Sequence, residues 1–242
     1  MPTFLAGNLE KTSENFGVRM AAFVLDRRKD SLVHKASKRV EEIRSKLWSL
    51  SKDDILELKN GTFIYNLEYG PLSYLHKIFS GCSKDDIVFI QKLIGFRLPS
   101  DYMEFLEFCN GCTLFDNTLF IYGANSRIER SISLEDQVAV SLERVLDNLK
   151  QSGKLHPNSH WVPVGAVAAY DKSFGIELSQ NGASRLTSSS GSSAVFGGFI
   201  DCLDFLVALL ERFCGVGRMS DSRARQLQLE LNRIVAPDQS SH

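Results

Sequence analysis

The run from Ser83 to Gly111 constrains the fold of this chain more than any other segment. Ser83 with Asp86 three residues later is a capping box that predicts the start of a helix, and Gly95 predicts its end. Leu98-Pro99 predicts the entry into a second helix, which Asn110-Gly111 ends. Strand-forming residues follow directly on both sides of a turn at Asp116-Asn117. Two adjoining helices that lead into a hairpin predict an α+β domain.

The rest of the chain extends this domain with strands and a closing helix. After the hairpin, whose strands we expect at 113–115 and 118–122, Ser133-x-x-Asp136 predicts a helix that runs to about Lys150. Further strands are predicted at 161–170, 173–178 and 194–199, with a serine-rich loop at 187–193. A helix over 203–213 and a second over 221–235 complete the pattern. We expect an antiparallel or mixed central sheet that is flanked by helices.

The N-terminal part is predicted to be helical and accessory. Apolar residues recur at helical spacing from Leu32 to Leu50, and short helices are expected at 51–61 and 72–79. The amphipathic helix is expected to dock on the chain's own core; a helix reserved for a partner or a membrane surface is the alternative. We therefore divide the chain into a helical extension at 1–80, an α+β domain at 83–216 and a helical or flexible tail at 217–242.

Composition excludes several classes of protein. Lys and Arg number 28 against 29 Asp and Glu, so the chain lacks the basic excess that direct nucleic-acid binding needs. The longest uncharged apolar stretch, 161–170, is far shorter than the roughly 20 residues of a membrane span. The apolar run 20–25 is too short for a signal-peptide core, and its basic residues follow it. Five scattered cysteines fit a reducing compartment. We predict a soluble, cytoplasmic protein.

No motif predicts a catalytic residue, a metal site or a cofactor. Cys109 and Cys112 have the C-x-x-C spacing, but they lie at a helix C-terminus, where the helix dipole does not lower a thiol pKa. His156 and His160 could complete a zinc site only if the fold brought them to the cysteines, so a thiol or zinc enzyme remains the third hypothesis. Phosphate-binding and hydrolase signatures are absent from the sequence.

Three segments resemble the SUKH superfamily. The run 94–111 is similar to the family pattern of a Leu-Pro, an aromatic-bearing helix and an Asn-Gly, and Trp161-Val-Pro163-Val-Gly165 resembles its Trp-x-Pro-Ile-Gly strand. The segment 199–210 resembles the closing Phe-Leu-rich helix of the family, and Cys112 departs from the pattern because a second Gly is common there. The positions that carry the resemblance read as structural, and they are Leu98, Pro99, Tyr102, Phe105, Leu106, Asn110, Gly111, Trp161, Pro163 and Gly165.

The resemblance implies a domain that binds proteins and has no enzymatic activity. In bacteria such domains typically are immunity proteins that neutralise a secreted toxin, often a nuclease, and fungal relatives regulate cell-wall synthesis through protein contacts. Residues 81–216 contain 16 acidic and 11 basic residues, a balance of −5 that suits a basic toxin domain. Our lead hypothesis is therefore an immunity protein, and a regulatory scaffold that recruits signalling proteins is the alternative. The expected partner contacts are Asp101, Glu104, Asp116, Asp171 and Glu177.

Overall fold

The computed structural model of the chain describes residues 38–49, 55–65, 75–95, 97–124, 139–153, 160–214 and 219–236. The helices are α2 (Lys38–Ser49), α3 (Lys84–Ile94), α4 (Ser100–Phe108), α5 (Leu142–Gln151), α6 (Phe199–Cys214) and α7 (Asp221–Val235). The strands are β1 (Ile55–Glu57), β2 (Phe63–Tyr65), β3 (His76–Ser80), β4 (Cys109–Leu114), β5 (Leu119–Ile121), β6 (Trp161–Ala169), β7 (Lys172–Ser179), β8 (Ser184–Ser188) and β9 (Ser193–Phe196).

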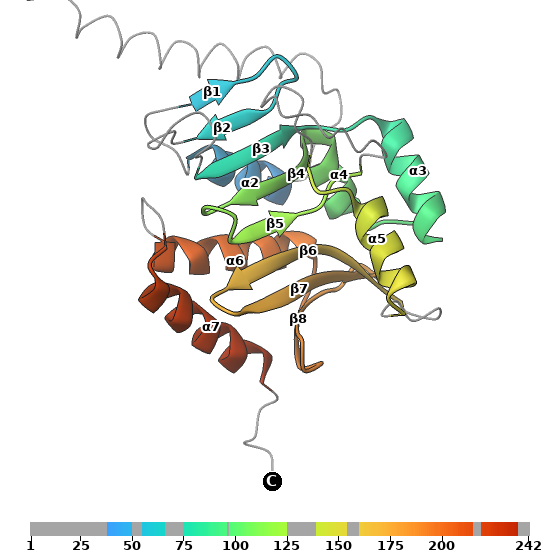
Figure 1. Cartoon of the computed structure of the whole chain (residues 1–242). Helices are drawn as coiled ribbons and strands as arrows, with labels where there is room; N and C mark the ends of the chain where they lie inside the picture. The colour runs from blue at the N-terminus through green and yellow to red at the C-terminus, as the bar shows by residue number, and fades with distance from the viewer. Residues whose placement is uncertain are drawn as a thin grey trace, which may run out of the picture.

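The nine strands of the described residues join one antiparallel sheet, and their spatial order is their order in the chain (Figure 1). Helices are inserted between neighbouring strands, with α3 and α4 between β3 and β4 and α5 between β5 and β6. The α+β prediction is confirmed, and the sheet is antiparallel.

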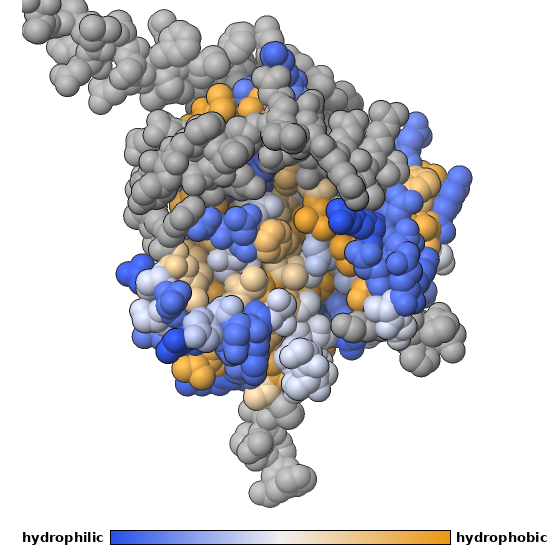
Figure 2. Space-filling view, viewed as in Figure 1, coloured by the Kyte–Doolittle hydropathy of each residue, from blue (hydrophilic) through white to orange (hydrophobic). Residues whose placement is uncertain are grey.

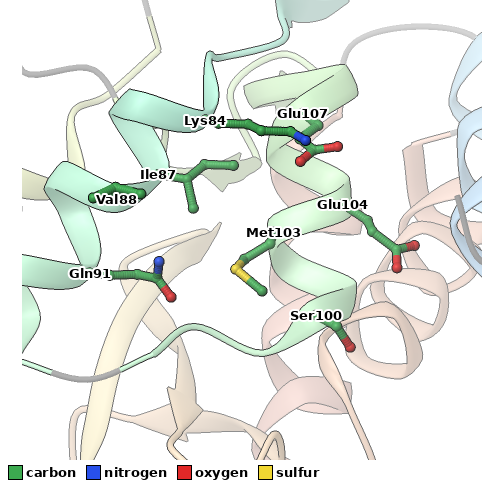
Figure 3. Close-up of a pocket in the computed structure, with 8 residues that line it drawn as sticks. All are labelled: Lys84, Ile87, Val88, Gln91, Ser100, Met103, Glu104 and Glu107. Carbon is green, nitrogen blue, oxygen red and sulfur yellow. The ribbon is translucent and has the colours of Figure 1, made fainter. Parts of the chain in front are cut away.

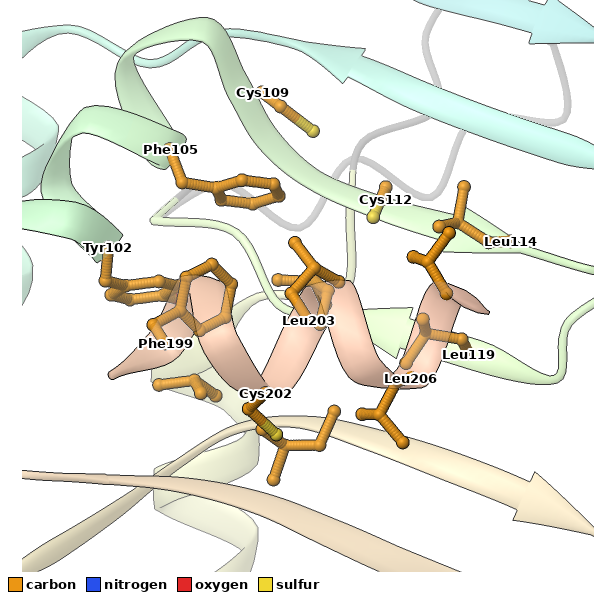
Figure 4. Close-up of a cluster of buried hydrophobic side chains, with 14 of the residues drawn as sticks. Tyr102, Phe105, Cys109, Cys112, Leu114, Leu119, Phe199, Cys202, Leu203 and Leu206 are labelled. Carbon is orange, nitrogen blue, oxygen red and sulfur yellow. The ribbon is translucent and has the colours of Figure 1, made fainter. Parts of the chain in front are cut away.

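The core forms where α6 packs between α4 and the sheet (Figure 4). Tyr102 and Phe105 of α4 meet Phe199 at the start of α6, with ring centroids 4.7 and 5.1 Å apart. Further along α6, Leu203 and Leu206 are buried in the same cluster as Leu114 and Leu119 of the β4–β5 hairpin. This arrangement explains why the closing helix carries apolar residues on so much of its surface.

Several predicted elements are confirmed because local signals determine them. The capping box of α3 is complete, since the Ser83 amide donates to Asp86 and the Asp86 amide donates to the Ser83 hydroxyl. Gly95 ends this helix in the left-handed conformation at φ 81°. The predicted N-terminal helix is present over 38–49, and its other expected residues, 32–37 and Leu50, lie outside the described ones.

Other predictions are wrong. Helices were expected at 51–61 and 72–79, but these segments contain β1 and most of β3, and β1 to β3 continue the sheet beside β4. The helix expected from Ser133 begins at Leu142 instead, where Ser141 is the N-cap; Ser133 itself lies outside the described residues. The predicted serine-rich loop starts inside β8, which the sequence analysis missed. The segment before residue 80 is therefore helical only in part.

Candidate protein-binding surfaces

The residues of the predicted family motif mostly hold the fold together. The Tyr102 hydroxyl donates to the Tyr122 carbonyl at 3.1 Å, and the Asn110 side-chain oxygen accepts from the Ala124 amide at 2.6 Å. Gly111 has φ 86°, and a Cβ there would lie 2.6 Å from the Ile121 carbonyl oxygen. A Cβ on Gly165 would lie 2.5 Å from the Phe120 oxygen. Leu98, Phe105 and Leu106 are buried, and Pro99 is the N-cap of α4.

Trp161 and Pro163 differ from these buried motif residues because they are only half-buried. Side chains of β6 to β9 alternate between the core, where α6 and α7 contact the strands, and the opposite face. We call this opposite side the open face; its residues are Trp161, Pro163, Ala166, Ala168, Ser173, Gly175, Glu177, Arg185, Thr187, Ser193 and Val195. Figure 2 shows it as a pale and orange surface bordered by blue.

One cross-strand row of the open face carries its charged residues. Pro163, Glu177, Arg185 and Val195 are register partners on four adjacent strands. The Arg185 Nε lies 2.6 Å from a Glu177 carboxylate oxygen, and the guanidinium carbon lies 4.2 Å from the centre of the Trp161 ring. The arginine thus bridges an aromatic ring and a carboxylate. Val195 at the end of the row is 67% exposed.

The five predicted partner contacts lie in three places. Glu177 is on the open face, but its charge is paired with Arg185. Asp116 and Asp171 belong to neighbouring turns at one end of the sheet, since the Ala168 amide donates to the Thr118 carbonyl at 2.7 Å. Asp101 and Glu104 are on α4. Asp101 accepts from the Ile200 amide at 3.2 Å and so connects α4 to the start of α6. The structure does not gather these residues into one acidic site.

The sequence analysis missed Arg185. It lies eight residues from Glu177 and becomes its direct neighbour only through the pairing of β7 with β8. In β8 the buried Ser184 and Leu186 alternate with the partly exposed Arg185 and Thr187, but Leu186 is the single apolar residue of this strand, so its sequence gives little signal of a period.

The cysteine pair is part of the core. Cys109 and Cys112 are buried, and the Cys109 thiol donates to the Gly111 carbonyl at 3.0 Å. His160 is exposed, while His156 lies outside the described residues. In the described part of the chain, no three His, Cys, Asp or Glu residues are grouped in a way that could hold a metal ion. Burial raises the pKa values of Cys202 and Cys214 to about 12, which keeps these thiols protonated.

The antiparallel sheet, the helices on one of its faces and the open face on the other define an α+β domain with a surface available for contact. Residues 81–185 match the model of the SMI1/KNR4 family (SUKH-1). This match supports membership of the SUKH superfamily for the segment 81–185. A search of curated proteins found no match. Within the described ranges, none of the helices is long and apolar enough to cross a membrane.

Proposed function

We propose that this protein is a cytoplasmic immunity protein that has no enzymatic activity and neutralises a cognate toxin by binding it through the open face. The SUKH family supports a role in protein binding, because it includes immunity proteins and cell-wall regulators. The observation that carries the proposal is the group of Trp161, Arg185 and Glu177 on the open face. Trp and Arg are the residue types that most often dominate the energy of protein interfaces.

The geometry of this group suits an interface. The Arg185 and Glu177 side chains are 28% and 23% exposed, so each keeps some surface available to a partner while it holds the other in place. A side chain that is already fixed loses less conformational entropy on binding. Small residues such as Ala166, Gly175 and Ser173 surround the group and would let a partner approach the sheet closely.

Affinity capture tests this proposal. The tagged full chain is purified from its native cells, and co-purifying proteins are identified and quantified by mass spectrometry. We expect one dominant partner near one-to-one stoichiometry that carries a toxin domain. Wall-synthesis or signalling proteins, or a diffuse set with no dominant member, would contradict the immunity role and favour the regulatory scaffold.

Deletion of residues 1–80 does not separate these two hypotheses. It would remove β1, β2 and β3, and the edge of β4 that now pairs with β3 would be exposed. It would also remove Val40, Ile43 and Leu47 of α2 from the core. Loss of binding in such a variant would report loss of folding, so point substitutions on surfaces are the better test.

A further inference from the structure

The strand β9 forms one edge of the sheet. Among the described strands it pairs with β8 alone, at the end of the spatial order. Its Val195 is 67% exposed, more than any other large apolar side chain that the structure describes. Phe196 points to the other face and is only half-buried, with its ring centroid 5.4 Å from that of Phe205 in α6. Apolar surface is therefore accessible on both faces of this edge.

The pairing with β8 determines which backbone groups of β9 point away from the sheet. The Ser188 amide donates to the Ser192 carbonyl at 2.9 Å, beside the turn of the hairpin. Bonded and non-bonded pairs alternate along an antiparallel ladder, so Ala194 forms the next bonded pair with β8. The backbone N–H and C=O groups of Ser193 and Val195 therefore point outward. Within the described residues, no hydrogen bond uses these outward groups.

Charge distinguishes this edge from the opposite one. The segment 186–200, which contains β9, includes no charged residue. The opposite edge strand, β1, contains Glu57 and follows Asp53 and Asp54 in the sequence. When two identical edges pair about a two-fold axis, a charge near the axis meets its own copy, and charged edge residues therefore prevent such pairing. The edge at β9 lacks this obstacle, so its own copy is a compatible partner.

The nearest charge, on β8, does not oppose the pairing of two β9 strands. Arg185 is the register partner of Val195, and its Nε lies 2.6 Å from a carboxylate oxygen of Glu177. Across two paired β9 strands, the two copies of Arg185 would be three strand spacings apart, about 14 Å. This separation exceeds the screening length of about 10 Å at 0.1 M salt.

The exposed apolar residues of α3 offer no comparable surface. Val88 is 45% exposed beside a groove between α3 and α4, and Figure 3 shows Met103 directed into this groove. Lys84, Glu104 and Glu107 line the same groove, so its charges have both signs. The backbone within a helix is hydrogen-bonded to the helix itself, whereas the outward groups of an edge strand can pair with another strand.

We propose that β9 pairs with β9 of a second copy of this chain, in antiparallel orientation about a two-fold axis. With Val195 at the axis, the two copies of this residue exchange both backbone hydrogen bonds, and their side chains meet on the open face. Phe196 of one copy lies opposite Ala194 of the other, a large side chain beside a small one. The two sheets become continuous with both open faces on the same side, so the dimer presents two binding surfaces.

Sedimentation equilibrium of the purified full chain over a range of concentrations tests the inference. We expect a reversible equilibrium between monomer and dimer at concentrations below about 1 mM. A chain that stays monomeric up to that concentration would overturn the inference. A chain that forms only larger assemblies would also overturn it, because pairing about a two-fold axis ends at two copies.

Two variants of Val195 test the edge itself. Val195→Pro removes an outward N–H and keeps the pairing with β8, since proline is tolerated on an edge strand where the N–H faces solvent. We expect it to weaken the dimer at least about tenfold. Val195→Lys keeps the backbone N–H, places two ammonium groups at the axis and should weaken the dimer more at low salt than at high salt. Circular dichroism checks the fold of both variants, and unchanged dimer affinity in both would overturn the inference.

Leu229→Ala and Val88→Ser are matched controls. They remove apolar surface from side chains that are 66% exposed on α7 and 45% exposed on α3. Both should dimerise within about twofold of the parent affinity, because they lie outside the proposed contact. Loss of the dimer in a control but not in the β9 variants would place the contact on a helix and overturn the inference.

Amide hydrogen exchange followed by NMR locates the contact on the backbone. At low concentration the outward amide of Val195 should exchange faster than the amide of Ala194, which points to β8. Higher concentration should slow exchange at Val195 at least about tenfold and change Ala194 little. Exchange at Val195 that does not depend on concentration would contradict the proposal. The inference does not depend on a toxin: a monomeric chain would refute the dimer, whereas a failed affinity capture would refute the proposed function.

Discussion

The strands β2 to β4 and the strands β6 to β9 belong to one sheet but bury their side chains differently. In β2 and β4 every residue is buried, and in β3 only the last residue is partly exposed. In β6 to β8 buried residues alternate with exposed or half-exposed ones, and in β9 exposed residues alternate with half-buried ones. A strand buried on both faces serves the core, whereas an alternating strand presents one face to its surroundings. One half of the sheet thus maintains the fold, and the other half can carry a binding surface.

Substitution of a glycine in β4 should have the largest effect on this comparison. In Gly111→Ala the new Cβ would lie 2.6 Å from the Ile121 carbonyl oxygen and 2.6 Å from the Ala139 Cβ, at a φ of 86°. We expect the free energy of unfolding to fall by more than about 3 kcal/mol, as measured by chemical denaturation. A loss below about 1 kcal/mol would show that β4 tolerates change as a surface strand does.

A pH-dependent contribution from His76 in β3 should be the next largest effect. Burial lowers the pKa of this histidine from 6.5 to about 4, and its Nδ1 accepts from the Phe115 amide at 3.3 Å. The unfolded chain therefore binds more protons between these two pKa values, so stability should increase as the pH rises from about 4 to 6.5. The contribution amounts to about 3 kcal/mol, complete above pH 6.5 and lost near pH 4.

Denaturation of the parent and of His76→Gln across this pH range checks the contribution. Glutamine keeps an acceptor for the Phe115 amide but does not titrate. The variant should lack the part of the pH dependence that His76 supplies, while the carboxylates contribute equally to both proteins. Identical pH profiles would mean that His76 has an ordinary pKa in the folded state.

A glycine of the open face should give the smallest effect on stability. In Gly175→Ala the Cβ would lie 2.9 Å from the hydroxyl oxygen of Thr187, a side chain that can rotate away. We expect the free energy of unfolding to change by less than about 1 kcal/mol, because alanine also restricts the unfolded chain. A loss as large as that of Gly111→Ala would contradict the difference between the two halves of the sheet.

The sequence predicts those parts of the fold that local chemistry determines. Ser83, Asp86 and Gly95 give the limits of α3, and the helix expected at 221–235 is present over those residues. The strands β1 and β2 contain three residues each, too few to show a period, and β3 buries His76 and Lys77, which composition assigns to the surface. Their strand structure depends on pairing with neighbouring strands, β3 with β4, β2 with β3 and β1 with β2, which is a tertiary effect.

The candidate site was only partly predictable for the same reason. The sequence predicts Glu177 as a charged residue on a strand, but it predicts no strand over 184–188, so Arg185 could not be assigned as its partner. The contact of Asp101 with the start of α6 could not be predicted, because the Ile200 amide that donates to it lies 99 positions away in the sequence. The sequence shows which residues carry a carboxylate. Only the register between β7 and β8 shows that Glu177 is already paired with Arg185.

Measurement of partner affinity for open-face variants tests the central claim most directly. Trp161→Ala and Arg185→Ala are compared with Leu229→Ala, which removes a 66% exposed side chain from α7. Binding of the captured partner is measured by calorimetry, with unfolding followed in parallel. We predict at least about tenfold weaker binding for the two open-face variants, unchanged affinity for Leu229→Ala, and folded protein in all three. Full affinity in both open-face variants would contradict the claim that β6 to β9 carry the binding surface.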